Sequence, residues 1–298
     1  MTNGREKSDS AIVAGKPTNK AEPSAAEPAE PRAEAEGHAG QQSTRRAQDR
    51  GSVSQALDRI RQAARQRRKE KFTALFHHLT IDRLEDAFNE LKEDAAAGVD
   101  GLTGTEYKAT LERNLEDLHA RLHRGAYRAS PSRRTYIPKP DGRQRPLAIA
   151  ALEDKIVQRA TAAVLSATPG SQSGGFLGFA YGFRPGRGTH DALDALAVGV
   201  TGKKVNFVLD ADIRAFFDEV SREWLIRFVE HRIGDPRIIR LIQKWLKAGV
   251  LEDGIVTDSG RGTGQGSAIS PLLANIYLHY VFDLWTDPRI TVRGLATA

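Results

Sequence analysis

Two aspartates, Asp210 and Asp212, directly follow the apolar run 205–209 and have the type and spacing for metal chemistry. Residues two apart on a strand project from one face, so their carboxylates would lie side by side and repel unless a cation joins them. Oxygen ligands of this kind suit Mg²⁺, which proteins commonly hold with one or two carboxylates and substrate phosphates. The pattern predicts a buried strand that ends in a magnesium site. The alternative is that one of the two carboxylates caps the following turn.

Basic residues are concentrated between residues 121 and 145, where eight arginines and lysines accompany one acidic residue, Asp141. The segment 135–149 is typical of two short strands around a turn, which would hold Lys139 and Arg145 at its two shoulders. Eight cations beside one anion repel one another and cost folding free energy. The window therefore predicts an anionic partner.

A second basic run lies between residues 59 and 71, where seven basic residues accompany one acid, Glu70. Two interpretations stay open: the run is a solvated helix face, or it is a polybasic arm that lies on a phosphate backbone. Binding by such an arm would weaken with rising salt, because phosphate contacts release counterions.

The glycine-rich segment 260–267 lacks the Lys-Ser/Thr pair of a phosphate-binding P-loop. Its glycines would let the backbone approach a base pair or a sugar closely, with Gln265 as its only amide side chain. The apolar stripe that follows, over residues 272–284, indicates a helix that faces the core.

The chain of 298 residues carries 44 basic and 38 acidic residues, a formal charge of +6, and no cysteine. The lack of cysteine excludes a disulfide framework, a thiolate nucleophile and a cysteine-ligated zinc site. No stretch approaches the roughly 18 apolar residues that span a bilayer. The polar start has no apolar signal core behind it. These features predict a soluble cytoplasmic protein.

The elements expected along the chain are helices and a few strands, an α+β pattern. Residues 1–53 are rich in Ala, Glu, Pro and Gly, and we expect a disordered tail there because such a segment buries too little apolar surface to offset its chain entropy. A helix is expected over 153–165. Two further helices are expected to start at Ser221 and at Asp235-Pro236, and Gly249 to end the second.

Five motifs occur in order along the chain. They are Ala97-Gly-Val-Asp-Gly, Tyr136-Ile-Pro-Lys-Pro-Asp-Gly-Arg-Gln-Arg-Pro-Leu, Tyr181-Gly-Phe-Arg-Pro-Gly-Arg-Gly-Thr-His-Asp-Ala, Asp210-Ala-Asp-Ile-Arg-Ala-Phe-Phe-Asp and Gly264-Gln-Gly-Ser-Ala-Ile-Ser-Pro-Leu-Leu-Ala-Asn. On these motifs the chain from Leu84 to Trp285 resembles the reverse transcriptases encoded by bacterial group II introns, also called intron maturases.

The resemblance implies a right-hand polymerase with an α+β fold. Basic helices and a fingers hairpin would occupy 54–150, and fingers with an incomplete palm, an antiparallel sheet packed with helices, would occupy 151–298. The implied activity is RNA-directed DNA synthesis with Mg²⁺ and deoxynucleoside triphosphates (dNTPs). Its partners would be intron RNA and a DNA primer or target. In two-metal phosphoryl transfer, the metals activate the primer 3′-hydroxyl and stabilise the pyrophosphate leaving group.

The resemblance also implies roles for single residues. Asp212 matches the catalytic aspartate that binds Mg²⁺, and Asp210 matches a less constant position. Nucleotide contacts are implied for Lys139 and Arg145 at the triphosphate, Phe217 at the sugar, and Gln265 and Gly266 beside the nascent base pair. RNA contacts are expected from Arg65, Arg67, Arg68, Arg133, Arg134, Arg184 and Arg187.

The sequence departs from the family at its end. The family continues to a Tyr-Ala-Asp-Asp motif that completes the metal site, whereas this sequence stops at Ala298 with neither an Asp-Asp pair nor a thumb. The last residues, Gly294-Leu-Ala-Thr-Ala, are unlike the expected continuation and suggest a frameshift or a premature stop. Two hypotheses follow: an RNA-directed DNA polymerase that binds intron RNA, or a truncated, inactive remnant that at most binds intron RNA.

Overall fold

The computed structural model describes residues 55–64, 66, 70–92, 94–138, 142–168, 178–184, 186–203 and 205–286, so the tail 1–53 lies outside it. Residues 55–64 are helical. The further helices are η1 (Phe76–His78), α2 (Ile81–Asn89), α3 (Gly104–Lys108), α4 (Leu111–His123), α5 (Leu152–Ser166), α6 (Thr189–Gly202), α7 (Phe216–Glu219), α8 (Arg222–Arg232), α9 (Pro236–Lys247), α10 (Ser270–Leu278), the π-helix η2 (His279–Asp283) and α11 (Leu284–Thr286). The strands are β1 (Ser132–Pro138), β2 (Gln144–Ile149), β3 (Val250–Glu252) and β4 (Ile255–Thr257).

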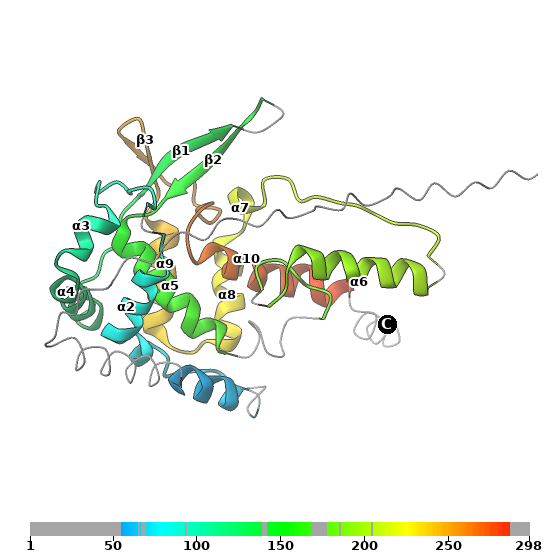
Figure 1. The fold of residues 1–298 in the computed structure, drawn as a ribbon, viewed down its shortest axis with the longest axis horizontal. Coiled ribbons are helices and arrows are strands. Elements are labelled where there is room, and N and C mark those ends of the chain that lie inside the picture. The colour runs from blue at the N-terminus through cyan, green and yellow to red at the C-terminus, as the bar shows by residue number, and fades with distance from the viewer. Residues whose placement is uncertain are drawn as a thin grey trace, which may run out of the picture.

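The four strands form one sheet in the order β2-β1-β3-β4, which confirms the α+β fold and the expected hairpin. β1 and β2 are antiparallel, with Arg133 opposite Ile149 and Ile137 opposite Arg145. β3 joins β1 in parallel, so the sheet is mixed rather than wholly antiparallel. In Figure 1 the β1–β2 hairpin extends from one end of the helical body.

Helix α5 runs through the middle of the core (Figure 1). Its residues Ile156, Val157, Ala160 and Val164 are completely buried, because apolar side chains recur at helical spacing on more than one face. A single cluster of buried residues joins α5 to α2, α4, α8 and α9. This core holds α5 and α8, two helices beside the candidate site, in fixed positions.

Two helix starts follow the sequence prediction. Ser221 caps α8 by accepting a hydrogen bond from the Trp224 N–H. Asp235 caps α9, which has Pro236 in its first turn. Asp235 does more than cap, since its Oδ2 also accepts hydrogen bonds of 2.9 Å from the N–H groups of Leu75 and Phe76. One buried carboxylate thus ties η1 to the start of α9.

Replacing Asp235 with alanine is expected to lower the free energy of unfolding by about 3 kcal/mol, because three backbone N–H groups lose their acceptor in a buried place. Asp235→Asn keeps an acceptor oxygen, and we expect it to cost about 1 kcal/mol. Denaturant unfolding of both variants measures the difference. An alanine variant as stable as the asparagine variant would contradict the assigned hydrogen bonds.

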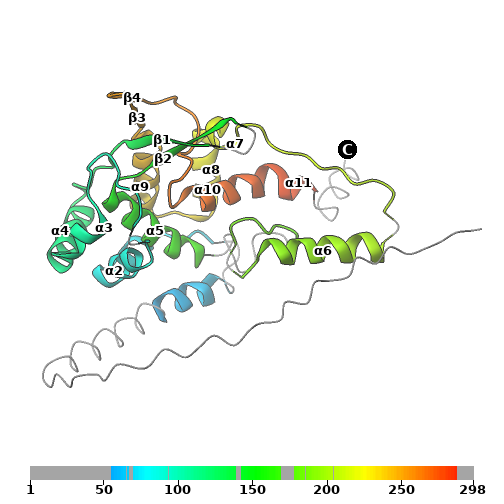
Figure 2. The ribbon, with the colours of Figure 1, turned by 45° about the horizontal axis from the view of Figure 1, so that its top comes forward.

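The predicted buried strand that ends in Asp210 and Asp212 is wrong. Residues 205–213 form neither helix nor strand and pair with no strand in the part of the chain that the structure describes, and Phe207 and Leu209 are 93% and 91% exposed. A strand needs a neighbour to accept its backbone hydrogen bonds. Without such a neighbour, the apolar run is a connection from α6 to α7 that lies apart from the body (Figure 2).

Candidate nucleotide and nucleic-acid site

The glycine-rich loop is bound to α7 through backbone hydrogen bonds. The Thr263 N–H donates to the Phe217 carbonyl at 2.7 Å, and the Gly262 N–H donates to the Val220 carbonyl at 2.8 Å. Gly262 has φ +77°, and a Cβ there would lie 2.6 Å from the Phe217 carbonyl oxygen. Only glycine permits this approach, so the aromatic helix and the loop form one unit.

Arg222 holds the start of this loop. Its Nε donates to the Gly262 carbonyl at 3.0 Å, and its Nη1 lies 2.5 Å from Asp258 Oδ1. Asp258 also accepts from the Gly260 N–H at 3.1 Å. Burial raises the pKa of Asp258, but the hydrogen bonds from Arg222 and Gly260 outweigh it and hold the pKa below its ordinary value. Asp258 therefore stays ionised and keeps Arg222 in place.

The other end of the loop is bound to β2 and α5. The Ala148 N–H donates to the Gln265 carbonyl at 2.7 Å. Gln158, on α5, accepts from the Ser267 hydroxyl at 2.7 Å and from the Ala268 N–H at 3.1 Å. The loop thus bridges β2, α5 and α7, and these hydrogen bonds fix its position.

A cavity of about 300 Å³ lies between this loop, α7 and the sheet. Phe217 and Gln265, which are far apart in the sequence, both line it, together with Arg134 of β1 and Arg222. Gly266, which follows Gln265, has φ +104° and a Cβ position 3.2 Å from the Ala148 carbonyl oxygen. The structure therefore brings two of the residues implied in nucleotide contact, Phe217 and Gln265, to one cavity.

The two aspartates lie outside this cavity. Asp210 and Asp212 are exposed in the run that leads into α7. Within the described ranges no group of three His, Asp or Glu side chains could hold a metal ion. Two exposed carboxylates still offer the oxygen donors that Mg²⁺ prefers, with the remaining positions open to water and phosphate. The donor chemistry of the run therefore fits Mg²⁺.

The basic residues divide into three groups. Arg145 is exposed on β2 near the end of the hairpin. Three arginines donate to backbone carbonyls. Arg133 donates to Ala97, Arg184 to Ala180, and Arg187 to both Gly178 and Ala180. Lys139, Arg65, Arg67 and Arg68 lie outside the described residues. The triphosphate contacts expected from Lys139 and Arg145, and the RNA contacts expected from the other arginines, stay predictions.

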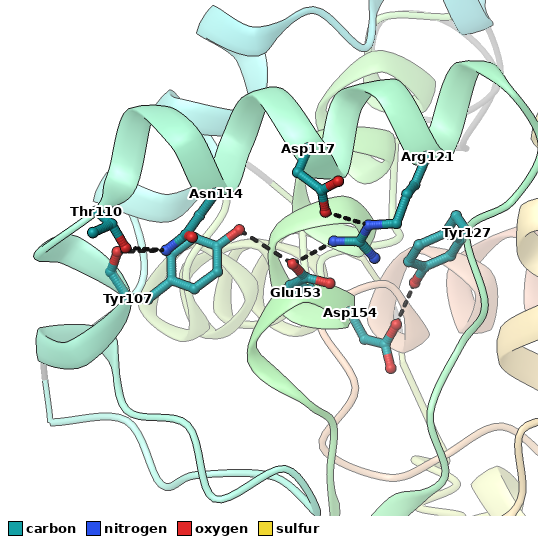
Figure 3. Close-up of polar contacts among 8 residues, drawn as sticks. All are labelled: Tyr107, Thr110, Asn114, Asp117, Arg121, Tyr127, Glu153 and Asp154. Carbon is teal, nitrogen blue, oxygen red and sulfur yellow. Dashed lines mark hydrogen bonds and ion pairs between the residues drawn. The ribbon is translucent and has the colours of Figure 1, made fainter.

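A polar network between α4 and α5 was not expected from the sequence (Figure 3). Arg121 of α4 pairs with Asp117 and with Glu153 of α5, both at 2.6 Å, and Tyr107 reaches the same Glu153 oxygen. The acids in the first turn of α5 were the only hint in the sequence. The network neutralises one cation of the basic window and joins α4 to α5.

Asp154 is the buried member of this region. It accepts hydrogen bonds from the Tyr127 hydroxyl and from the Ser130 N–H, just before β1. Trp245 of α9 donates to the Tyr127 hydroxyl at 2.8 Å. Burial raises the pKa of Asp154 to about 6, although these hydrogen bonds lower it. The base of the hairpin is thus joined to α5 and α9 through a carboxyl group that ionises near neutral pH.

When the pH is lowered from 7 to 5, the free energy of unfolding of the wild type is expected to rise by about 1 kcal/mol relative to that of Asp154→Asn. The folded-state pKa lies above the ordinary value of 3.8, so this stabilisation is complete below 3.8 and is lost as the pH rises through about 6. Denaturant unfolding of both proteins at the two pH values isolates the contribution of this carboxyl. The same pH dependence in both would show that Asp154 titrates normally.

Residues 137–292 match the family described as reverse transcriptase (RNA-dependent DNA polymerase). The chain belongs to this family.

Among the described residues, no helix is both long and apolar enough to cross a membrane.

Relatives confirm the resemblance to group II intron reverse transcriptases. Protein YkfC of Escherichia coli is 39% identical over 195 residues, which cover 64% of this chain and 50% of YkfC. The group II intron-encoded protein LtrA of Lactococcus lactis is 32% identical over 247 residues, 79% of this chain and 40% of LtrA. An uncharacterised 91 kDa protein in the cob intron of Schizosaccharomyces pombe is 35% identical over 201 residues, 67% of this chain and 24% of that protein. The chain thus spans half or less of the length of these relatives.

Proposed function

We propose that this chain takes part in RNA-directed DNA synthesis as a group II intron reverse transcriptase, with intron RNA, a DNA primer or target, and dNTPs as its partners. The observation that carries the proposal is the cavity at which Phe217, of the Asp-Ile-Arg-Ala-Phe-Phe-Asp motif, and Gln265, of the glycine loop, lie together. Membership of the family and the likeness to LtrA support the same activity. The cytoplasm is the compartment that we propose for it.

The proposed roles follow from the chemistry of each side chain. Lys139 and Arg145 bind the triphosphate of the dNTP, since cations neutralise its phosphates. Phe217 packs against the sugar, and the Gln265 loop lies beside the base pair. Asp212, with Asp210, binds Mg²⁺, which when bound supplies the charge that stabilises the attacking 3′-oxygen and the leaving pyrophosphate.

Primer extension tests this proposal. The full chain is incubated with a labelled DNA primer annealed to an RNA template, dNTPs and Mg²⁺, and a parallel reaction contains excess chelator. We expect template-directed extension that chelator abolishes, because phosphoryl transfer of this kind requires divalent metal. RNA binding without extension, as the remnant hypothesis predicts, would overturn the proposal for this chain.

A further inference from the structure

Helix α6 and the run 205–213 that follows it expose a large apolar surface. Nine of their large apolar side chains are between 42% and 93% exposed, namely Leu193, Leu196, Val198, Val200, Val205, Phe207, Val208, Leu209 and Ile213. Soluble proteins seldom expose a continuous apolar patch larger than roughly a few hundred Å², and larger patches mark interaction sites. We therefore expect another protein surface to cover this segment.

Helix α6 itself has the composition of a covered helix. None of its residues is buried by the described part of the chain. Its polar side chains lie mainly in its first two turns, and Leu193, Leu196 and Val200 recur at helical spacing beyond them. A helix of such apolar character is normally buried, so its exposed face is suited to a partner.

The run 205–213 has the composition of a strand but no strand beside it in the described ranges. On a strand, Val205, Phe207 and Leu209 would share one face, because side chains alternate. A second extended segment beside this run would supply partners for its backbone groups and bring further apolar side chains to the same face.

The charges at the two ends of the run indicate that the second segment is a copy of the same chain. Lys203 and Lys204 precede the apolar residues, and Asp210 and Asp212 follow them. In an antiparallel pair of copies, the basic end of each run lies against the acidic end of the other. Opposite charges across two strands stabilise the pair, whereas a parallel pair would bring like charges together. A two-fold dimer joins the same surface of both copies, and an antiparallel pair of identical strands has that symmetry.

We propose that two copies of this chain associate through antiparallel pairing of their runs 205–209, with α6 of each copy covering the paired strands. A two-stranded ribbon alone is marginal in water, and packing against a helix stabilises it. Nine side chains of this size expose on the order of 500 Å² of apolar area in each copy, so two copies would bury on the order of 1,000 Å², which is enough for a specific interface. This association does not depend on the proposed polymerase activity.

Sedimentation velocity of the full chain over a range of concentrations tests this interface. The buffer contains no divalent metal, because Mg²⁺ at Asp210 and Asp212 would compete with the lysines. We expect an equilibrium between monomer and dimer that stops at two copies, since an interface of this symmetry closes on itself. Phe207→Ser is expected to raise the dissociation constant of the dimer at least about tenfold, because it removes an apolar side chain from both halves of the interface.

Ile255→Ser provides the matched control. Ile255 is 65% exposed on β4, which lies away from the run 205–213 (Figure 2). We expect this variant to dimerise with the dissociation constant of the wild type. Because Phe207 is 93% exposed, both variants are expected to keep the wild-type Tm under conditions in which the chain is monomeric.

Two charge variants test the antiparallel orientation. Lys203→Glu with Lys204→Glu makes both ends of the run acidic, and Asp210→Lys with Asp212→Lys makes both ends basic. Each variant alone is expected to dimerise at least about tenfold more weakly than the wild type, because like charges then meet at both ends. An equimolar mixture of the two is expected to form heterodimers with close to the wild-type affinity, since opposite charges meet again.

Three results would overturn the interface. One is a wild type that stays monomeric throughout, which would leave the apolar surface to a different protein. The second is a species that grows beyond two copies, which would indicate unspecific aggregation. The third is a pair of charge variants, each with the wild-type Tm, that either dimerise as the wild type does or fail to associate when mixed. A dimer that extends no primer would support the interface and overturn the polymerase alone.

Discussion

Replacing Asp212 with asparagine is expected to lower Mg²⁺-dependent primer extension by about 100-fold or more, because one lost metal ligand removes several kcal/mol of charge stabilisation from the transition state. The free energy of unfolding is expected to stay within about 0.5 kcal/mol of the wild type. The reason is that Asp212 is exposed and has no ion pair or hydrogen bond to another described residue. Primer extension and denaturant unfolding on the same preparations measure both quantities.

Asp194→Asn provides the matched control for this change. Asp194 is an exposed carboxylate on α6, and its removal changes the net charge by the same amount. We expect that variant to extend primers at the wild-type rate. If Asp212→Asn retains extension within twofold of the wild type, Asp212 is not the metal ligand that the motif indicates.

The second large effect is expected from Gly262→Ala, which should lower the free energy of unfolding by about 4 kcal/mol. A Cβ at this position would lie 2.6 Å from the Phe217 carbonyl oxygen and 2.7 Å from that of Asp218. The loop must move away, and it then loses the hydrogen bonds from the N–H groups of Gly262 and Thr263.

Gly260→Ala separates the steric effect from backbone strain. Gly260 has φ +68°, close to that of Gly262, but a Cβ there would have no neighbour within 4 Å. We expect Gly260→Ala to lower the free energy of unfolding by only about 1 kcal/mol, which is the strain of a left-handed non-glycine residue. Denaturant unfolding compares the two variants. Equal costs would show that the contact between the loop and α7 contributes nothing to stability.

The elements that local interactions encode were predictable. The β1–β2 hairpin follows from two short strands around a turn, and the starts of α8 and α9 follow from Ser221 and Asp235-Pro236. Each depends on residues a few positions apart, since a cap or a turn is completed within one segment. The ordered motifs likewise identified the family, which residues 137–292 confirm.

The strand expected over 205–209 shows where such prediction fails. An apolar run favours a buried strand, but burial requires a neighbouring strand and a covering face from elsewhere in the fold. No described segment takes that place, so Phe207 and Leu209 are exposed. The same reason leaves the magnesium site as a proposal, because the geometry of Asp210 and Asp212 depended on that strand.

By itself, then, the sequence determined the hairpin, the helix caps, the family and the candidate residues. Only the tertiary structure decided which cations of the basic window pair with distant acids: Arg121 pairs with Glu153 and Arg134 with Glu252, both outside the window. It also decided that Phe217 and Gln265 line one cavity. Caps and turns arise from contacts between near neighbours, whereas ion pairs and cavities arise between segments that only the folded core holds together.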